Sequence, residues 1–410
     1  MPNLSRLVIV DGLRTPFCRA GTELAALGAD ELGRLATSAL LTRTGLDPAL
    51  IDEVIFGCVA QPADSANIAR VIALRAGIPQ SVPAVTVHRN CASGFEAITT
   101  AAERLAAGRG SVFLVGGTES MSQVPLLFPE GAARKFGALA KSKSATRKIA
   151  ALSAFRLADF EPRVGLKLGL TDPVCGLNMG DTAELLASEG NITREAQDTF
   201  AMRSHERALA AESRLAEEIA PVFLNGKAIV KDNGPRNDQT LEVLGGLRPV
   251  FQKYGSVTAG NSSQVTDGAV ALLVMSEQRA TELGFKPLGV LTNYAYAGCD
   301  PTRMGLGPVF AIDRAAKRSG LMPADADLIE VNEAFAAQVL AVLQRVPIPD
   351  EKLNVNGGSI ALGHPVGATG ARLVLTALKE LQRRDAKRAL VTLCVGGGQG
   401  GTLWLERSAS

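Results

Sequence analysis

Aromatic residues are scarce in this chain of 410 residues, where they amount to 4% and include one tryptophan and three tyrosines. A core with so few rings must be packed by aliphatic side chains, and hydrophobic residues do reach 46% of the sequence. An excess of charge of one sign is also lacking, because 43 basic residues offset 41 acidic ones and leave a formal net charge of +2. The charge of the whole chain therefore indicates no nucleic-acid partner.

Long apolar runs and paired cysteines are missing too. No segment reaches the roughly 18 apolar residues that a membrane span needs, and the early run LVIVDGL is too short for a signal peptide. Six cysteines are scattered without a C-x-x-C pair, at Cys18, Cys58, Cys91, Cys175, Cys299 and Cys394. We expect neither a metal site nor a disulfide framework. The predicted setting is a reducing cytoplasm, of bacterial type, or an organelle matrix.

The order of elements repeats loosely along the chain. Residues 45–120 and residues 320–400 each run helix, strand, helix, strand and glycine loop. Such alternation is typical of an α/β architecture in which helices cover the sheets. Residues 121–250 interrupt the pattern with a more polar, mostly helical sequence, which indicates a lid or an insertion over a site.

Cys91 lies where a strand is expected to meet a helix. The stretch VHRNCASGF follows a strand that ends at Val87, and residues 92–108 carry apolar side chains at helical spacing. Unpaired N–H groups at a helix N-terminus favour negative charge and lower a thiol pKa by up to roughly one and a half units. Cys91 is thus either a reactive cysteine, with thiolate common at neutral pH, or a small buried hydrophobic side chain.

A reactive cysteine needs a base, and the chain has three histidines. His205 lies in a charged helical stretch and is expected at the surface, while His88 is close to Cys91 in sequence but need not face it. His364 lies in GGSIALGHPVGATG, where five glycines and the following Pro365 predict a tightly folded loop. His364 is therefore the preferred candidate for the base.

Two further stretches end a predicted strand with chemically useful groups. Cys394 in LCVGGGQGG precedes bare backbone N–H groups that could stabilise an oxyanion, or the cysteine is incidental to a flexible turn. Asn332 in EVNEAF stands between a strand and a helix, where it is either an N-cap or a polar residue of the site.

Four motifs in this order, NCASGFEAI, NEAFAAQ, GGSIALGHPVGATGAR and CVGGGQG, resemble the thiolase family. The resemblance includes VDGLRTPF and GSVTAGNSSQVTDGA, so it covers essentially the whole chain. It implies the thiolase fold, an α/β fold with a five-layered αβαβα core of two similar halves and a mostly helical loop domain. We accordingly expect a first half over 1–120 completed by 251–284, a loop domain over 121–250 and a second half over 285–410.

The resemblance implies a role for each candidate. Cys91 would be the acylated nucleophile, His364 its base, and Cys394 the acid/base that exchanges a proton with the acetyl α-carbon. Asn332 would position a water in an oxyanion hole shared with His364, and the N–H groups of Cys91 and Gly396 would form a second hole. Two thiols and an imidazole would suffice for reversible Claisen chemistry, with coenzyme A (CoA) as co-substrate and no metal or other cofactor.

The resemblance also implies residues around the CoA thioester. The predicted CoA and acyl contacts are Ser263, Phe251, Met179, Met304, Phe335 and Arg236. Arg236 either meets the nucleotide phosphates or is a solvated arginine. Asn178 stands where many short-chain thiolases carry a histidine, which argues against a pocket for short 2-methyl substrates. The family implies at least a homodimer, often a homotetramer.

Residues 132–156 carry seven basic residues and no acidic one, with apolar residues between them. Such a helix could lie on an anionic membrane surface, or it could be a solvated helix near the CoA phosphates. The segment resembles the insertion in the β subunit of the fatty-acid-oxidation trifunctional enzyme, which makes a hydratase–dehydrogenase partner subunit possible. The main hypothesis is therefore a degradative 3-ketoacyl-CoA thiolase of β-oxidation, acting on medium or long chains. The alternatives are a short-chain acetyl-CoA acetyltransferase, a decarboxylating ketoacyl synthase and a non-catalytic CoA-binding scaffold of the same fold.

Overall fold

The computed structural model describes residues 6–408 and divides them into two compact units. The large unit combines the residues up to Gln123 with those from Asp172 onward, and the small unit comprises Val124–Thr171. Both copies of the expected repeat lie in the large unit, so the boundaries expected at residues 120, 250 and 284 stay predictions. Within residues 6–408 no helix is long and apolar enough to cross a membrane.

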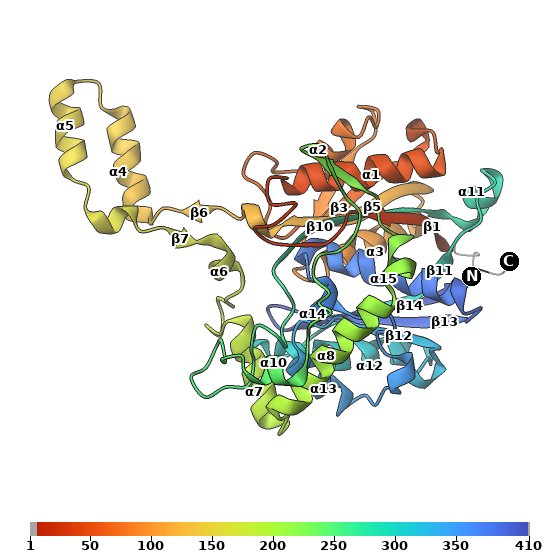
Figure 1. Ribbon diagram of the computed structural model, residues 1–410. Helices are drawn as coiled ribbons and strands as arrows, with labels where there is room; N and C mark the ends of the chain where they lie inside the picture. Colours follow the sequence, from red (N-terminus) through yellow and green to blue (C-terminus); the bar gives the residue numbers. More distant parts are fainter. Residues whose placement is uncertain (1–5, 409–410) are drawn as a thin grey trace. The chain divides into compact units, whose positions relative to one another are not determined.

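Ten strands of the large unit pair into one mixed sheet (Figure 1). They are β1 (Leu7–Arg14), β2 (Cys18–Arg19), β3 (Glu53–Gly57), β4 (Ala84–Val87), β5 (Val112–Ser120), β10 (Thr266–Ser276), β11 (Gly289–Gly298), β12 (Leu328–Val331), β13 (Arg388–Val395) and β14 (Gln399–Arg407). Their order is β12-β13-β14-β11-β1-β10-β5-β3-β4, and β2 pairs with β10.

The sheet is built from two similar halves. In the first half β3 runs parallel to β5, β5 antiparallel to β10, and β10 antiparallel to β1. In the second half β12 runs parallel to β13, β13 antiparallel to β14, and β14 antiparallel to β11. A short antiparallel pairing of β1 with β11 joins the two halves. The loose repeat predicted from the sequence is confirmed as a duplicated strand pattern.

Helices form three layers around the two half-sheets (Figure 1). The six helices involved are α1 (Ala29–Thr44), α2 (Ile68–Arg75), α3 (Ser93–Ala106), α12 (Gly307–Ser319), α13 (Ala336–Leu343) and α15 (Val366–Arg383). Helix α1 packs on α2 and on β1, β5 and β10, while α12 packs on β11, β13 and β14. Helices α3 and α15 pack on each other, and α15 contacts strands of both halves. The layers therefore alternate helix, sheet, helix, sheet, helix.

The same kind of turn follows the first helix of each half, α1 in the first and α12 in the second. Gly45 ends α1 and Gly320 ends α12, each with a positive φ that glycine adopts without strain. Asp52 then accepts hydrogen bonds from the N–H groups that begin β5, and Asp327 accepts the equivalent pair at the start of β13. These matched details come from equivalent sequence positions, which explains why the repeat is visible in a single sequence.

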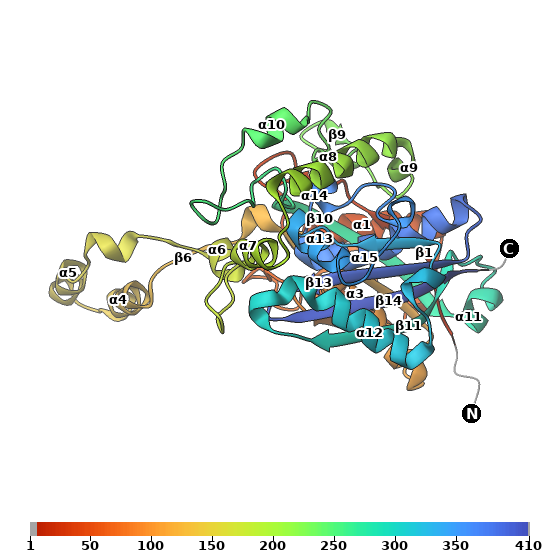
Figure 2. The same cartoon turned by 90° about the horizontal axis from the view of Figure 1, so that it is seen from below.

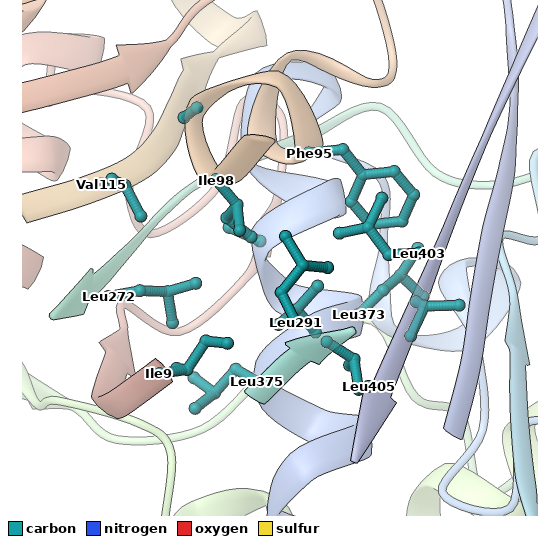
Figure 3. Packing of buried hydrophobic residues seen from close by; sticks show 14 of the residues in the cluster. Ile9, Phe95, Ile98, Val115, Leu272, Leu291, Leu373, Leu375, Leu403 and Leu405 are labelled. Atoms are coloured by element: carbon teal, nitrogen blue, oxygen red, sulfur yellow. The ribbon is translucent and has the colours of Figure 1, made fainter. Parts of the chain in front are cut away.

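The core between the half-sheets is aliphatic, as the scarcity of aromatic residues predicts. Figure 3 shows its centre, where side chains from β1, α3, β5, β10, β11, α15 and β14 converge. Phe95 of α3 is one of the few rings in it, and most of the other side chains there are leucine, isoleucine, valine or alanine. The buried faces of α3 and α15 thus bind both half-sheets into one structure.

The remaining elements of the large unit are mostly helical. They are α7 (Met179–Glu189), α8 (Arg194–Ala210), α9 (Glu212–Ala216), α10 (Leu241–Gly245), α11 (Glu277–Glu282), α14 (Ser359–Leu362) and the hairpin of β8 (Val222–Leu224) and β9 (Lys227–Ile229). Helix α8 packs on α10, α13 and α14 (Figure 2). These contacts bring residues 172–250 beside the loops that follow β12 and precede α15.

The small unit is a helical pair on a two-stranded ribbon. Its elements are β6 (Leu126–Leu127), α4 (Glu130–Lys141), α5 (Ala145–Ser153), β7 (Arg163–Val164) and α6 (Gly165–Gly169). Helices α4 and α5 lie side by side in both views (Figures 1 and 2). The single basic helix expected over residues 132–156 is therefore wrong, because Ser144 caps the start of α5 by accepting a hydrogen bond from the N–H of Arg147.

Candidate active site

Cys91 lies in the turn between β4 and α3, as the sequence predicts. Asn90 before it adopts a positive φ of 43° and donates from Nδ2 to the backbone oxygen of Gly396 over 2.7 Å. This bond ties the turn to the glycine loop that follows β13. Ala92 is the N-cap of α3 and offers no side-chain acceptor, so the first N–H groups of the helix are not used by a capping side chain.

The resting Cys91 thiol is protonated. Burial raises its pKa above the ordinary value, while the N–H groups of Gly396 and of Cys91 itself hydrogen-bond the sulfur and lower the pKa by less. The expectation that thiolate is common at neutral pH is therefore wrong, because desolvation outweighs the two N–H groups. The two N–H groups that meet at the sulfur are the pair expected to form an oxyanion hole.

His364 is buried and held at both ring nitrogens. Nδ1 lies 2.6 Å from Oγ1 of Thr369, and Nε2 lies 3.5 Å from Nδ2 of Asn332. Its backbone N–H donates to Oγ1 of Thr266 over 3.1 Å. Burial and, to a smaller extent, the nearby Arg372 lower the pKa of His364 to about 4. The imidazole is therefore neutral at physiological pH and able to accept a proton.

Close packing of two helices brings Cys91 and His364 to the same place. Each residue stands two positions before a central helix, Cys91 before α3 and His364 before α15. A Cβ on Gly94 of α3 would lie 2.5 Å from the backbone nitrogen of Ala371 and 3.2 Å from the backbone oxygen of Gly367. Only a glycine allows the first turns of the two helices to approach this closely.

Cys394 is the second thiol of the site. It precedes the last residue of β13 and is buried in the same apolar cluster as Met304 and Phe335. Burial raises its pKa well above the ordinary value, and the neighbouring Cys91 raises it further. Cys394 is therefore a protonated thiol with Cys91 nearby. Met179 lies next to the loop after it, since a Cβ on Gly396 would be 3.3 Å from the sulfur of Met179.

Asn332 follows β12 and is fully buried. Helix α13 begins at Ala336 with Phe335 as its N-cap, so the alternative that Asn332 caps this helix is wrong. The next residue, Glu333, accepts hydrogen bonds from Ser204 Oγ over 2.6 Å and from Asn354 Nδ2 over 2.8 Å. These bonds fix the chain on the C-terminal side of Asn332.

Four of the six predicted substrate contacts lie together. Met179, Phe251, Met304 and Phe335 belong to the apolar cluster that contains Cys394. The rings of Phe251 and Phe335 meet edge to face, with centroids 6.0 Å apart. Ser263 lies nearby, because its N–H donates to the backbone oxygen of Ala334, next to Phe335, over 2.9 Å. This apolar wall beside two thiols suits an acyl thioester.

Arg236 is exposed, and it is absent from this cluster. Its backbone N–H donates to Nδ1 of His205 over 3.2 Å. His205 is buried, with 4% of its surface exposed, so the expectation that it lies at the surface is wrong. In the sequence His205 lies among charged residues of α8, but in the structure the loop that carries Arg236 covers it. Burial lowers the pKa of His205 to about 4.

Three polar residues close to the site were missed by the sequence analysis. Ser359, Thr369 and Arg372 are fully buried and hydrogen-bond Asn332, His364 and Ser359 in turn. All three lie in the stretch GGSIALGHPVGATGAR. The sequence analysis interpreted its glycines and its histidine but assigned no role to its serine, threonine and arginine. His88, by contrast, is exposed and interacts with its own turn.

Comparison with known proteins agrees with this geometry. The family described as "Thiolase, N-terminal domain" matches residues 7–278, and "Thiolase, C-terminal domain" matches residues 285–407. The chain belongs to the thiolase family. It is 42% identical to an acetyl-CoA acetyltransferase of Allochromatium vinosum over 98% of this chain and 99% of that protein. This thiolase is 44% identical to a 3-oxoadipyl-CoA/3-oxo-5,6-dehydrosuberyl-CoA thiolase of Escherichia coli, over 97% and 98% of the two chains.

A solved structure shares the fold throughout. The crystal structure of human mitochondrial 3-ketoacyl-CoA thiolase in complex with CoA matches with a TM-score of 0.89 and 38% identity, over 99% of this chain and 98% of that one. The predicted thiolase fold is confirmed, and the chain is a thiolase-type acyltransferase that acts on CoA thioesters. The names of the similar curated proteins favour the short-chain alternative over the main hypothesis of a long-chain β-oxidation enzyme. The six cysteines of this chain are all free thiols.

Proposed function

We propose that this thiolase is a short-chain acetyl-CoA acetyltransferase, which converts acetoacetyl-CoA and CoA to two molecules of acetyl-CoA and catalyses the reverse condensation. The observation that carries the proposal is full-length similarity, at 42% identity, to proteins named acetyl-CoA acetyltransferase. The partly buried thiol of Cys91 and the buried thiol of Cys394, together with a neutral imidazole, support the same chemistry. CoA enters as a co-substrate, and the proposed steps use no other cofactor.

The first step forms an acyl enzyme. Cys91 Sγ attacks the 3-keto carbon of acetoacetyl-CoA as its proton passes to His364, and the keto oxygen becomes negative. The bond between C2 and C3 then breaks, which leaves an acetyl group on Cys91 and the enolate of acetyl-CoA. Cys394 donates its proton to C2 of this enolate, and acetyl-CoA leaves.

The second step transfers the acetyl group to CoA. The thiol of free CoA attacks the carbonyl carbon of acetyl-Cys91 and loses its proton to a basic group of the site. Collapse of the tetrahedral intermediate breaks the bond to Cys91 Sγ, which is protonated again. The first step leaves Cys394 as a thiolate and His364 as an imidazolium. The thiolate can accept the proton of CoA and the imidazolium can return a proton to Cys91, which restores the starting protonation state.

Two sets of donors would stabilise the negative oxygens. The N–H groups of Cys91 and Gly396 already converge at the sulfur, which supports their assignment to the oxyanion of the acyl enzyme. Asn332 Nδ2 and His364 Nε2 lie together in the buried region. This supports their assignment to the enolate oxygen, which Asn332 would reach through a water and His364 would reach with Nε2–H once it has taken the proton of Cys91. Losing one such donor typically costs about 10² to 10³ in rate.

A 3-ketoacyl-CoA thiolase for longer chains is the second candidate. Asn178, which stands in place of the histidine typical of short-chain enzymes, accepts a hydrogen bond from the N–H of Gly180 and caps α7 beside Met179. No imidazole is supplied from this position. The similarity to human mitochondrial 3-ketoacyl-CoA thiolase over nearly the whole chain supports this candidate as well.

The partners of the chain also stay predictions. We infer a homodimer or homotetramer, and β4 is a partly exposed edge strand of the kind that pairs between subunits. A membrane contact, a contact with the CoA phosphates or a hydratase–dehydrogenase partner remains proposed for residues 132–156, where exposed Ile149 and Leu152 accompany the basic side chains of α5. A cytoplasmic setting likewise remains part of the proposal.

The test is CoA-dependent cleavage of acetoacetyl-CoA and of 3-ketohexadecanoyl-CoA, measured side by side. We expect the wild type to cleave acetoacetyl-CoA with the higher kcat/KM, and Cys91→Ala to be at least about 10³-fold slower because the nucleophile is gone. Cys299→Ala is the matched control: it is another partly buried free cysteine, and its loss should leave both rates within a factor of two.

The ratio of the two rates separates the candidates. Faster cleavage of the long substrate would replace the short-chain proposal by the 3-ketoacyl-CoA thiolase. Activity that survives Cys91→Ala would remove the covalent mechanism for both. An inactive wild type that still binds CoA would favour the scaffold alternative.

A further inference from the structure

Asn332 is held at both ends of its amide. Oδ1 accepts a hydrogen bond from Ser359 Oγ over 2.6 Å, and Nδ2 lies 3.5 Å from Nε2 of His364. All three side chains are at least nine-tenths buried. The imidazole contacts a donor if the amide nitrogen faces it and an acceptor if the amide oxygen does, so the orientation of the amide matters.

Arg372 decides the direction of the Ser359 hydroxyl. This arginine of α15 is fully buried, and its Nη2 donates to Ser359 Oγ over 3.2 Å. A guanidinium only donates, so the single proton of the serine is left for another acceptor, which is Asn332 Oδ1. Glu330 of β12 anchors the arginine, with Oε2 3.3 Å from Nη1.

The hydrogen bonds of the His364 imidazole follow from the orientation of Asn332. With Oδ1 occupied by the serine, Nδ2 faces His364, and a donor there needs a bare Nε2. The ring proton is then on Nδ1, which donates to Thr369 Oγ1 over 2.6 Å, and the hydroxyl of Thr369 donates to the backbone oxygen of Pro365 over 3.0 Å. Every bond from the arginine to this carbonyl runs the same way, because one end can only donate and the other can only accept.

We propose that Ser359, oriented by Arg372, is a positioning residue that fixes the Asn332 amide and thereby keeps His364 in the tautomer with a bare Nε2. The proposal adds to the proposed thiolase function by naming the residues that prepare its base. Without the serine hydroxyl the amide can turn over, and its oxygen would then face the ring and favour a proton on Nε2. The base would be blocked and the amide donor would point away from the enolate oxygen.

The direct test is nitrogen NMR of protein labelled with ¹⁵N-histidine, in which the two tautomers give different nitrogen shifts. The chain has three histidines, so the His364 signals can be assigned by their loss in His364→Gln. We expect the Nδ1–H tautomer in the wild type and a substantial Nε2–H population in Ser359→Ala. This readout does not depend on turnover, so it separates failure of the positioning proposal from failure of the proposed function.

The kinetic test uses acetoacetyl-CoA. Ser359→Ala should lower kcat about tenfold with KM within a factor of two, because orientation and not binding is lost. Ser359→Thr, which keeps the hydroxyl, should retain most of the activity. In the Asn332→Ala background, Ser359→Ala should lower kcat no further, because the serine acts through the asparagine.

Thr376→Val is the control for a lost buried hydroxyl. Thr376 lies on the same helix as Arg372 and donates to Glu218, away from the site. It should lower the melting temperature by an amount similar to Ser359→Ala and leave kcat unchanged. An unaltered His364 tautomer in Ser359→Ala, or the same loss of kcat with and without Asn332, would overturn the proposal.

Discussion

At the residue scale, the three groups proposed to react are uncharged at rest. Burial raises the pKa of the Cys91 and Cys394 thiols and lowers that of the His364 imidazole to about 4. A thiolate–imidazolium pair would carry two charges in a largely buried site, which is costly. Proton transfer from Cys91 is therefore coupled to its attack, and charge develops on the substrate oxygen, where the N–H donors lie.

Because the His364 imidazole is neutral, we predict that the rate of acylation falls only at an unusually low pH. The pKa of His364 is lowered to about 4, so the base is present above that pH and is lost as the pH falls through it. Acylation of Cys91 by acetyl-CoA, followed as CoA release in a single turnover, should stay level down to about pH 5 and fall about tenfold per pH unit below about pH 4.

Circular dichroism at each pH shows whether the fold persists over the range of that experiment. An acid limb near the ordinary imidazole pKa of about 6.5, with the fold intact, would contradict the neutral-pair mechanism. It would mean that solvent or a nearby carboxylate stabilises the imidazolium.

The sequence predicted where the candidate reacting residues lie in the fold, but it did not predict their charge states. Cys91, His364 and Cys394 stand in specific motifs, and the structure places them at the ends of the elements predicted for them. Their pKa values depend on desolvation by residues far away in the chain. The same reason explains His205, whose helix looks solvated in sequence and is covered by a loop about 30 residues later.

At the scale of elements, the contact between α3 and α15 brings together the turn that carries Cys91 and the loop that carries His364. Gly94 and Gly370 face each other's backbone, and a Cβ on Gly370 would lie 2.6 Å from the nitrogen of Phe95. Neither backbone can move without shifting a helix that supports both half-sheets. The separation of Cys91 and His364 is therefore determined by helix packing and not by the loops that carry them.

Gly94→Ala tests this packing. The added methyl group meets the backbone nitrogen of Ala371 at 2.5 Å, so the helices must separate. We expect a loss of about 1–3 kcal/mol in the free energy of unfolding, typical of overpacking, and a fall in kcat of up to about 10²-fold from the displaced base. Urea unfolding and thiolysis kinetics on the same samples measure both.

Gly245→Ala serves as the control, since a Cβ there meets nothing within 4 Å in helix α10. It should leave kcat unchanged and be neutral or slightly stabilising, because alanine favours a helix. A Gly94→Ala enzyme that keeps wild-type kcat would show that the site tolerates movement of α3.

At the scale of the whole molecule, the repeat and the motif order were enough to predict the layered fold. The pairing of β1 with β11 that joins the halves could not be predicted, because it is short and links residues about 280 positions apart. The small unit was also not foreseen as a separate body. Its boundaries at Val124 and Thr171 follow from which contacts form, and the basic stretch over residues 132–156 does not by itself indicate a separate unit.

The acid stability of the molecule gives a last prediction, on His205. Burial lowers its pKa to about 4, so the unfolded chain takes up the proton first as the pH falls below about 6.5, and stability is lost between these two values. His205→Gln keeps an acceptor for the N–H of Arg236 but takes up no proton. Buried carboxyls with raised pKa values, such as Glu330 at about 8, shift stability in the opposite direction. They are common to both proteins and cancel in the difference.

Between pH 7 and pH 4 the unfolding free energy of the wild type, measured relative to His205→Gln, should therefore fall by about 3 kcal/mol, the equivalent of the shift in pKa. Urea unfolding of both proteins at several pH values measures it. A difference that does not change with pH would mean that His205 is solvated in the folded protein, and that the loop of Arg236 does not cover it in solution.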